Sequence, residues 1–88
     1  MKIDFYGHTL ELNDEIIEKH GKFAGYAYAE TDEEYKKCLV NEISAAIRIV
    51  HHIRTNEYET LFKKYNNKQI VKTIEERFLS ELIETMAW

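Results

Sequence analysis

Proline is absent from this chain, and its 88 residues include only three glycines and one cysteine. With so few residues that break or bend the backbone, we expect one compact fold with short connections. A single thiol, Cys38, excludes an internal disulfide framework and a thiolate-based zinc site within one chain. This use of cysteine is typical of a reducing compartment.

The sequence also lacks a long apolar run. No stretch is long enough to span a bilayer, and Met1 leads into an alternating segment instead of a basic region followed by an apolar one. We therefore expect neither a membrane anchor nor a secretory signal. The expected location is the cytoplasm.

Motifs that carry catalysis or bind a cofactor are missing as well. The sequence contains no glycine-rich phosphate loop, no nucleophile elbow, no His-Glu-x-x-His pair and no cysteine cluster. His51 and His52 are adjacent, so on a helix their side chains point about 100° apart and cannot bind one ion without ligands from another segment. We expect no enzymatic activity, no cofactor, no bound metal and no small-molecule substrate.

What the chain does contain is a long helix-forming stretch from Thr31 to Arg54. Thr31 and Glu34 have the spacing of a capping box, in which each side chain accepts a hydrogen bond from the backbone N–H of the other residue. Apolar residues then recur at spacings of four and three. They are Tyr35, Leu39, Ile43, Ala46, Val50 and Ile53, flanked by Cys38, Val40, Ala45, Ile47 and Ile49. So wide an apolar face needs cover from two sides, by other elements or by a second copy of the chain.

Glu42 is the polar residue whose position stands out. On the expected helix it falls inside the apolar arc, where a carboxylate is costly unless a hydrogen bond or a cation compensates it. We therefore expect a specific partner, such as a tyrosine hydroxyl, a histidine or a basic side chain. A structural role is the main interpretation of Glu42, and a catalytic carboxylate is the alternative.

The segment before this helix predicts a β-hairpin over residues 2–12. A two-residue turn at Gly7 and His8 places Ile3 opposite Leu12 and puts the apolar residues of both strands on one face.

A short helix should follow the hairpin, capped by Asn13 and ended by Gly21. In residues 22–30, small side chains and tyrosines alternate, which favours a third strand, while a helical approach to Thr31 is the alternative.

Two further helices are expected at the C-terminal end. Thr55 or Asn56 would cap the first, and the second would run from Lys68 to Thr85. The predicted fold class is α+β: a small antiparallel sheet, made of the hairpin and a possible third strand, packed against the central helix and two C-terminal helices. We expect a single domain over residues 1–88, with the helical part beginning at residue 31 and enough apolar surface left for a homodimer.

Charge is segregated along the chain, although the net charge is only −4. Residues 1–34 hold nine acids and three bases, whereas residues 35–72 hold three acids and eight bases. The acidic candidates for binding a protein are Glu11, Asp14, Glu15, Glu18, Glu30, Asp32, Glu33 and Glu34. Carboxylates spaced along a small rigid domain can imitate a phosphate backbone and occupy the cationic groove of a nucleic-acid-handling protein.

Small phage inhibitors of restriction or CRISPR systems often use such acidic surfaces, although no motif here matches a particular family. The function expected from the sequence is therefore a phage-like or mobile-element accessory protein that binds and inhibits or regulates a basic, nucleic-acid-processing protein in the host cytoplasm. The alternative is a small DNA- or RNA-binding regulator that uses the basic middle of the chain. Its candidate residues are Arg48, His52, Arg54, Lys63, Lys64, Lys68 and Lys72.

Overall fold

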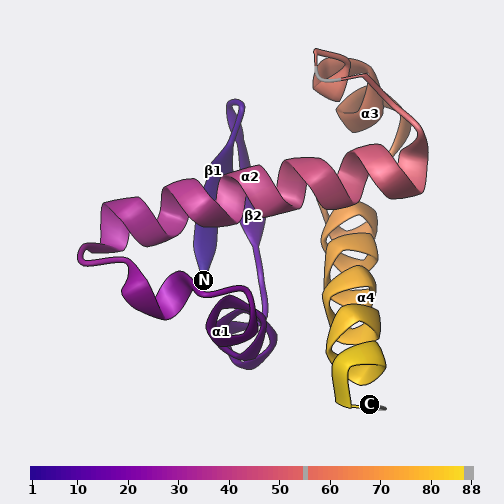
Figure 1. The fold of residues 1–88 in the computed structure, drawn as a ribbon. Helices are drawn as coiled ribbons and strands as arrows, with labels where there is room; N and C mark the ends of the chain where they lie inside the picture. Colours follow the sequence, from indigo (N-terminus) through magenta and orange to yellow (C-terminus); the bar gives the residue numbers. More distant parts are fainter. Residues whose placement is uncertain (55, 87–88) are drawn as a thin grey trace.

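The computed structural model describes residues 1–54 and 56–86, with residues 27, 85 and 86 described by their backbone alone. Within them the chain forms a two-stranded antiparallel sheet and four α-helices, which confirms the α+β class and the long central helix (Figure 1). The elements are β1 (Lys2–Phe5), β2 (His8–Glu11), α1 (Asp14–Phe23), the short 3₁₀ helix η1 (Tyr26–Tyr28), α2 (Asp32–His51), α3 (Tyr58–Lys64) and α4 (Asn67–Met86).

The hairpin turns one residue earlier than predicted. Its turn residues are Tyr6 and Gly7, both with positive φ, of 49° and 85°. Positive φ at both positions is the geometry that matches the twist of paired strands. Ile3 therefore pairs with Leu10, and the predicted pairing of Ile3 with Leu12 is wrong. Because the register differs by two residues, each side chain still lies on the predicted face of the sheet.

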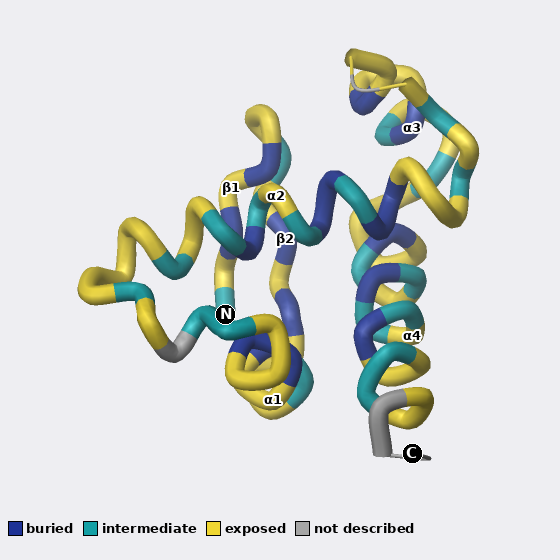
Figure 2. The backbone as a smooth tube through the Cα atoms, viewed as in Figure 1, coloured by how far each residue is buried: buried dark blue, intermediate teal, exposed yellow. Residues whose placement is uncertain are grey.

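That face is the centre of the core. Ile3, Phe5, Leu10 and Leu12 are all at most 2% exposed. Helices α2 and α4 pack against β1 and β2 respectively, and Figure 2 shows buried positions along the hairpin and on both helices. Their buried residues include Leu39, Ile43 and Ile47 from α2, and Ile70, Ile74 and Phe78 from α4. The opposite face of the hairpin remains exposed.

Helix α4 also joins the two ends of the chain. Asn67 Nδ2 donates a hydrogen bond to the carbonyl of Thr9, with a donor–acceptor distance of 3.2 Å. The backbone N–H of Asn13 donates to Glu75 Oε1 at 2.7 Å. Helix α1 packs on the same helix. The first quarter of the chain is therefore held by residues more than fifty positions away.

Helix α1 begins as predicted, with Asn13 Oδ1 accepting hydrogen bonds from the backbone N–H groups of Glu15 and Ile16. It does not end at Gly21, which is buried inside the helix where Tyr35 of α2 approaches closely. The left-handed glycine that follows the helix is Gly25, with φ of 87°.

The predicted third strand over residues 22–30 is wrong. These residues complete α1 and then form η1, so the sheet has two strands within the described part of the chain. Small and aromatic side chains alternate here, but no neighbouring strand pairs with this segment in the described part of the chain. Its backbone groups form local helical hydrogen bonds in place of bonds to a strand.

The capping box of α2 is confirmed in part. Thr31 Oγ1 accepts a hydrogen bond from the N–H of Glu34, but the Glu34 carboxylate accepts from the N–H of Glu30 and not from that of Thr31. The helix ends at His51, three residues before the predicted end, because His52 adopts a left-handed conformation with φ of 51°.

The two C-terminal helices differ in how they begin. The N-cap residue of α3 is Glu57, without a side-chain cap, so the prediction that Asn56 caps it is wrong; Thr55 lies outside the described residues. Helix α4 begins with a reciprocal cap, in which Asn66 and Gln69 each accept the backbone N–H of the other. No helix in the described part of the chain combines the length and apolarity needed to cross a bilayer.

Candidate functional site

All eight acidic candidates are exposed, and they lie on neighbouring parts of the fold: the end of β2, helix α1, the residue before Thr31 and the first turn of α2. Glu34 accepts a hydrogen bond from the backbone of Glu30, and Asp14 contacts the amino group of Met1. Glu18 forms an ion pair with Lys22 at 3.1 Å. The structure therefore gives some of these carboxylates local cations while leaving their side chains in solvent.

A depression of about 440 Å³ lies between α1 and the start of α2. Asp14, Glu18 and Asp32 line it together with Tyr26 and Tyr35. The hydroxyl of Tyr26 donates to the carbonyl of Cys38, and that of Tyr35 donates to the carbonyl of Ile17, each at 3.2 Å. These bonds fix the two rings as an aromatic wall beside the carboxylates.

Electrostatics in the depression favour bound cations. Hydrogen bonding to Asp14 is the main influence that raises the pKa of the Met1 amino group, so the ammonium form is stabilised here. Burial raises the pKa of Tyr35, and the negative charge of Glu18 adds to the effect, so this side chain remains a neutral hydroxyl. Met1 and Lys22 also line the depression and already pair with Asp14 and Glu18. A basic side chain entering it would therefore meet Asp32 and the two aromatic rings, without a competing phenolate.

Tyr28 lies on the same side of the fold, in η1 between α1 and α2. Its side chain is 89% exposed, the largest exposure of any large apolar or aromatic side chain in the described part of the chain. The exposed acids Glu30, Asp32 and Glu33 follow it directly in the sequence. We call these four residues the Tyr28 face.

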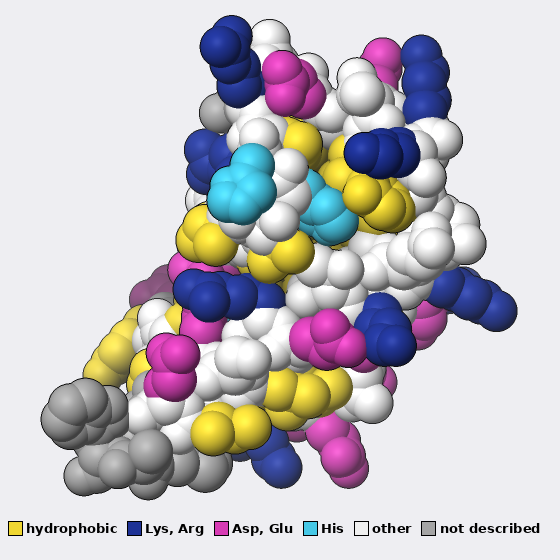
Figure 3. All heavy atoms as spheres, turned by 90° about the vertical axis from the view of Figure 1, so that its right-hand side faces the viewer, with side chains coloured by type: hydrophobic (Ala, Val, Ile, Leu, Met, Phe, Trp, Pro, Cys, Tyr) yellow, Lys and Arg dark blue, Asp and Glu magenta, His cyan; other side chains and the backbone are white. Residues whose placement is uncertain are grey.

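The basic candidates are all exposed, but the structure does not bring them into one stripe. Figure 3, which faces α3 and α4, shows Lys and Arg side chains spread over the surface with Asp and Glu among them. Tyr58 is buried and Tyr65 is half-buried, so neither offers an exposed ring on which a base could stack. The nucleic-acid alternative remains a prediction without added support.

His51 and His52 separate at the end of α2. His51 is half-buried, with its ring 5.0 Å from that of Tyr65, whereas His52 is exposed. Burial lowers the pKa of His51, and nearby Lys64 lowers it further. Within the described residues neither histidine belongs to a group of three metal-ligating side chains.

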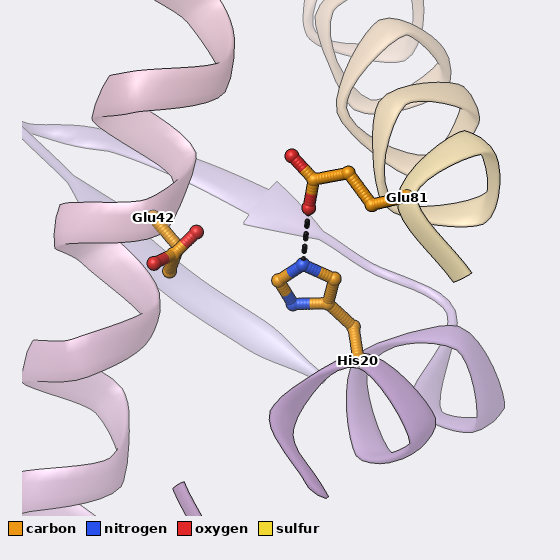
Figure 4. Close-up of side chains that lie close together, drawn as sticks. All are labelled: His20, Glu42 and Glu81. Atoms are coloured by element: carbon orange, nitrogen blue, oxygen red, sulfur yellow. Dashed lines mark hydrogen bonds and ion pairs between the residues drawn. The ribbon is translucent and has the colours of Figure 1, made fainter. Parts of the chain in front are cut away.

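A different cluster forms where α1, α2 and α4 meet. His20, Glu42 and Glu81 converge from these helices, and one possible ligand atom from each lies within 4.8 Å of the others (Figure 4). His20 Nε2 contacts Glu81 Oε2 at 2.8 Å, and Arg77 Nε lies 3.2 Å from Glu81 Oε1. The ring of His20 is 1% exposed and stacks on Phe78, with ring centroids 3.8 Å apart.

Glu42 is half-buried and lies beside the ring of His20, but the prediction that it has a specific bonded partner is wrong for the described residues. It forms neither a hydrogen bond nor an ion pair within the described part of the chain. Sequence reasoning identified Glu42 but missed His20 and Glu81. The same pattern, a polar residue on the apolar face of a helix, was present for both. His20 lies three residues after buried Ile17, and Glu81 lies three residues after buried Phe78.

The chain matches no protein-family model, and it has no significant match among curated proteins or solved structures.

Proposed function

We propose that this protein is a non-enzymatic module that binds a basic protein through the Tyr28 face and the adjoining depression. The observation that carries the proposal is the exposure of Tyr28 in a segment whose next charged residues, Glu30, Asp32 and Glu33, are exposed acids. An exposed ring adds little to the stability of the free chain, because it buries little apolar area. Tyrosine is among the residues enriched at the energetic centres of protein interfaces, because its ring buries a large area and its hydroxyl can form hydrogen bonds.

The exposed acids that follow Tyr28 in the chain would supply selectivity. Exposed carboxylates steer a cationic partner toward the face and disfavour acidic ones. The depression beside it offers carboxylates and the rings of Tyr26 and Tyr35, a combination that suits lysine or arginine side chains. A basic protein surface therefore complements both the charge and the aromatic character of this side of the molecule.

The most concrete form of the proposal is an accessory protein of a phage or mobile element that inhibits or regulates a nucleic-acid-processing protein. Such proteins expose cationic grooves for a phosphate backbone, which an acidic face can occupy. Enzymes of restriction or CRISPR systems are the partner class that we propose. The proposed compartment is the cytoplasm of the host, where Cys38 would remain a free thiol.

The test begins with capture of partners by the immobilised chain from a bacterial lysate, followed by purification of the protein captured. We expect that protein to bind fluorescently labelled DNA or RNA and to release it when the chain is added. Replacing Tyr28 with serine should weaken capture about 30-fold, as expected for about 2 kcal/mol at an interface centre. The charge reversals Glu30→Lys and Glu33→Lys together should also weaken capture.

The matched control reverses two exposed acids elsewhere, Glu59→Lys in α3 and Glu84→Lys in α4, and has the same net charge as the test variant. It should capture the partner nearly as well as the natural sequence does. If both double variants lost partner capture equally, net charge alone would explain the loss. That result would contradict the assignment of the Tyr28 face. Release of no nucleic acid would contradict the inhibitory role.

A further inference from the structure

The cluster of His20, Glu42 and Glu81 serves no purpose in the proposed binding face. It brings one imidazole and two carboxylates together from three different helices. These residues are at least 22 positions apart in the sequence, so their convergence is a product of the tertiary fold. In Figure 4 the three side chains point toward a common space between α1, α2 and α4.

The protein alone leaves this cluster incompletely compensated. His20 Nδ1 is buried and has no hydrogen-bond partner within the described residues. In Figure 4 this nitrogen, which carries no dashed line, lies on the side of the ring toward α2. Leaving a buried polar atom without a partner destabilises the fold. Glu42 forms no hydrogen bond or ion pair with the residues that the structure describes, and it lies close to a second carboxylate that repels it.

We propose that His20, Glu42 and Glu81 form a binding site for a divalent first-row transition-metal ion such as Zn²⁺. A cation among the three ligand atoms would compensate the charge of Glu42, which the ion pair of Glu81 with Arg77 leaves unbalanced. One imidazole nitrogen with two carboxylate oxygens is a ligand set that suits such ions, whereas Ca²⁺ and Mg²⁺ prefer oxygen ligands alone. Three protein ligands are the number found in zinc sites that keep one position for water.

The surroundings favour this arrangement. Stacking on Phe78 fixes the ring of His20, and Arg77 holds the second oxygen of Glu81. Neighbours that orient ligands in this way strengthen metal binding. The side chain of Glu81 is 29% exposed and Glu42 is half-buried, so an ion can reach the buried imidazole from the carboxylate side. Binding needs only a small closure, since ligand atoms around Zn²⁺ lie about 2.0–2.2 Å from the ion.

The test measures Zn²⁺ binding to the full chain, prepared without a polyhistidine tag and treated with a chelator. We expect saturable binding of one ion per chain by calorimetry, and a melting temperature that rises with Zn²⁺ concentration. Substitution with Co²⁺ should give visible absorption bands that report the geometry of the ligands.

Glu42→Gln is the decisive variant, because Glu42 holds no hydrogen bond within the described residues and the amide has nearly the same shape. It should keep the fold and weaken Zn²⁺ affinity at least about 10-fold, since even changes to outer-shell partners usually cost that much. Glu76→Gln, at an exposed position of α4, is the matched control and should bind like the natural sequence.

Two results would overturn the proposal. One is the absence of saturable Zn²⁺ and Co²⁺ binding by a folded chain. The other is binding that survives Glu42→Gln unchanged but is lost in the double variant His51→Gln and His52→Asn, which would place the ion at the end of α2. Partner capture does not involve these residues. A negative result for metal binding would therefore not contradict the proposal that the Tyr28 face binds a protein.

Discussion

At the scale of single residues, His51 couples the stability of the fold to pH. Its Nε2 atom is buried without a hydrogen-bond partner in the described part of the chain, and burial together with Lys64 lowers its pKa below the usual 6.5. The unfolded chain therefore binds a proton at His51 more readily than the folded chain. Stability from this residue is present above about pH 6.5 and is lost as pH falls below it, because unfolding then takes up protons.

We predict that His51→Gln makes stability less dependent on pH. The difference in the free energy of unfolding between pH 7.5 and pH 5.5, measured by urea denaturation, should be smaller in this variant than in the natural sequence. His52→Asn is the control, since His52 is exposed and asparagine tolerates its left-handed backbone. A pH dependence that is the same in all three proteins would contradict this role of His51.

Single residues also show how far the sequence could lead. Glu42 was identified from the helical period alone, because a charge inside an apolar arc is visible in a sequence. Its neighbours could not be named, since His20 and Glu81 reach it only through the packing of three helices. Identifying such a group requires knowing which helices pack together and which residues meet where they cross. A periodic sequence pattern gives neither piece of information.

At the scale of elements, the crossing of α1 and α2 depends on Gly21. A Cβ atom at this position would lie 2.6 Å from the hydroxyl oxygen of Tyr35 and 3.1 and 3.2 Å from two of its ring carbons. The whole ring would have to shift, which would break its hydrogen bond to Ile17. The glycine is therefore kept for close approach between helices, although it is a poor helix former.

We predict that Gly21→Ala destabilises the natural protein by about 1 kcal/mol, because the cost of overpacking exceeds the gain in helix propensity. In a Tyr35→Ala background, where the ring is gone, the same substitution should stabilise by up to about 1 kcal/mol. Urea denaturation of the four proteins measures this change of sign. Stabilisation by Gly21→Ala in the natural sequence would contradict the packing role.

The elements that were predicted correctly are those with local signals. The caps at Asn13 and Thr31 and the long apolar period of α2 depend on neighbours within a few residues. For the hairpin, the predicted buried face is correct but the predicted register is wrong. The reason is that Tyr6 adopts a positive φ, which sequence rules expect mainly of glycine or asparagine. Its ring stacks on Tyr58 of α3, a tertiary contact that no local rule includes.

At the scale of the whole molecule, the helices leave apolar side chains in water. Leu79 and Ile83 lie one turn apart on α4 and are 40% and 66% exposed, and Ile49 and Val50 on α2 are 54% and 43% exposed. The broad apolar faces expected from the sequence are thus covered only in part. We still predict that a second copy of the chain covers these exposed apolar side chains.

We expect light scattering at high protein concentration to show a dimer. Leu79→Arg with Ile83→Arg should shift the molecule to a monomer with its helical content unchanged, because the charges lie in the proposed interface. Glu59→Arg, on exposed α3, is the control and should leave the dimer intact. A natural sequence that stays monomeric at every concentration would refute the dimer.

The contacts of α4 with the first quarter of the chain also bear on the order in which the protein can fold during synthesis. The hairpin and α1 leave the ribosome first, yet two strands alone are marginal in water and their apolar face is completed by Ile70, Ile74 and Phe78. The hydrogen bonds to Thr9 and Asn13 come from the same late helix. A nascent chain that has only reached α3 therefore carries a hairpin that α2 alone can cover, on the side of β1, and the apolar face is complete only when α4 emerges.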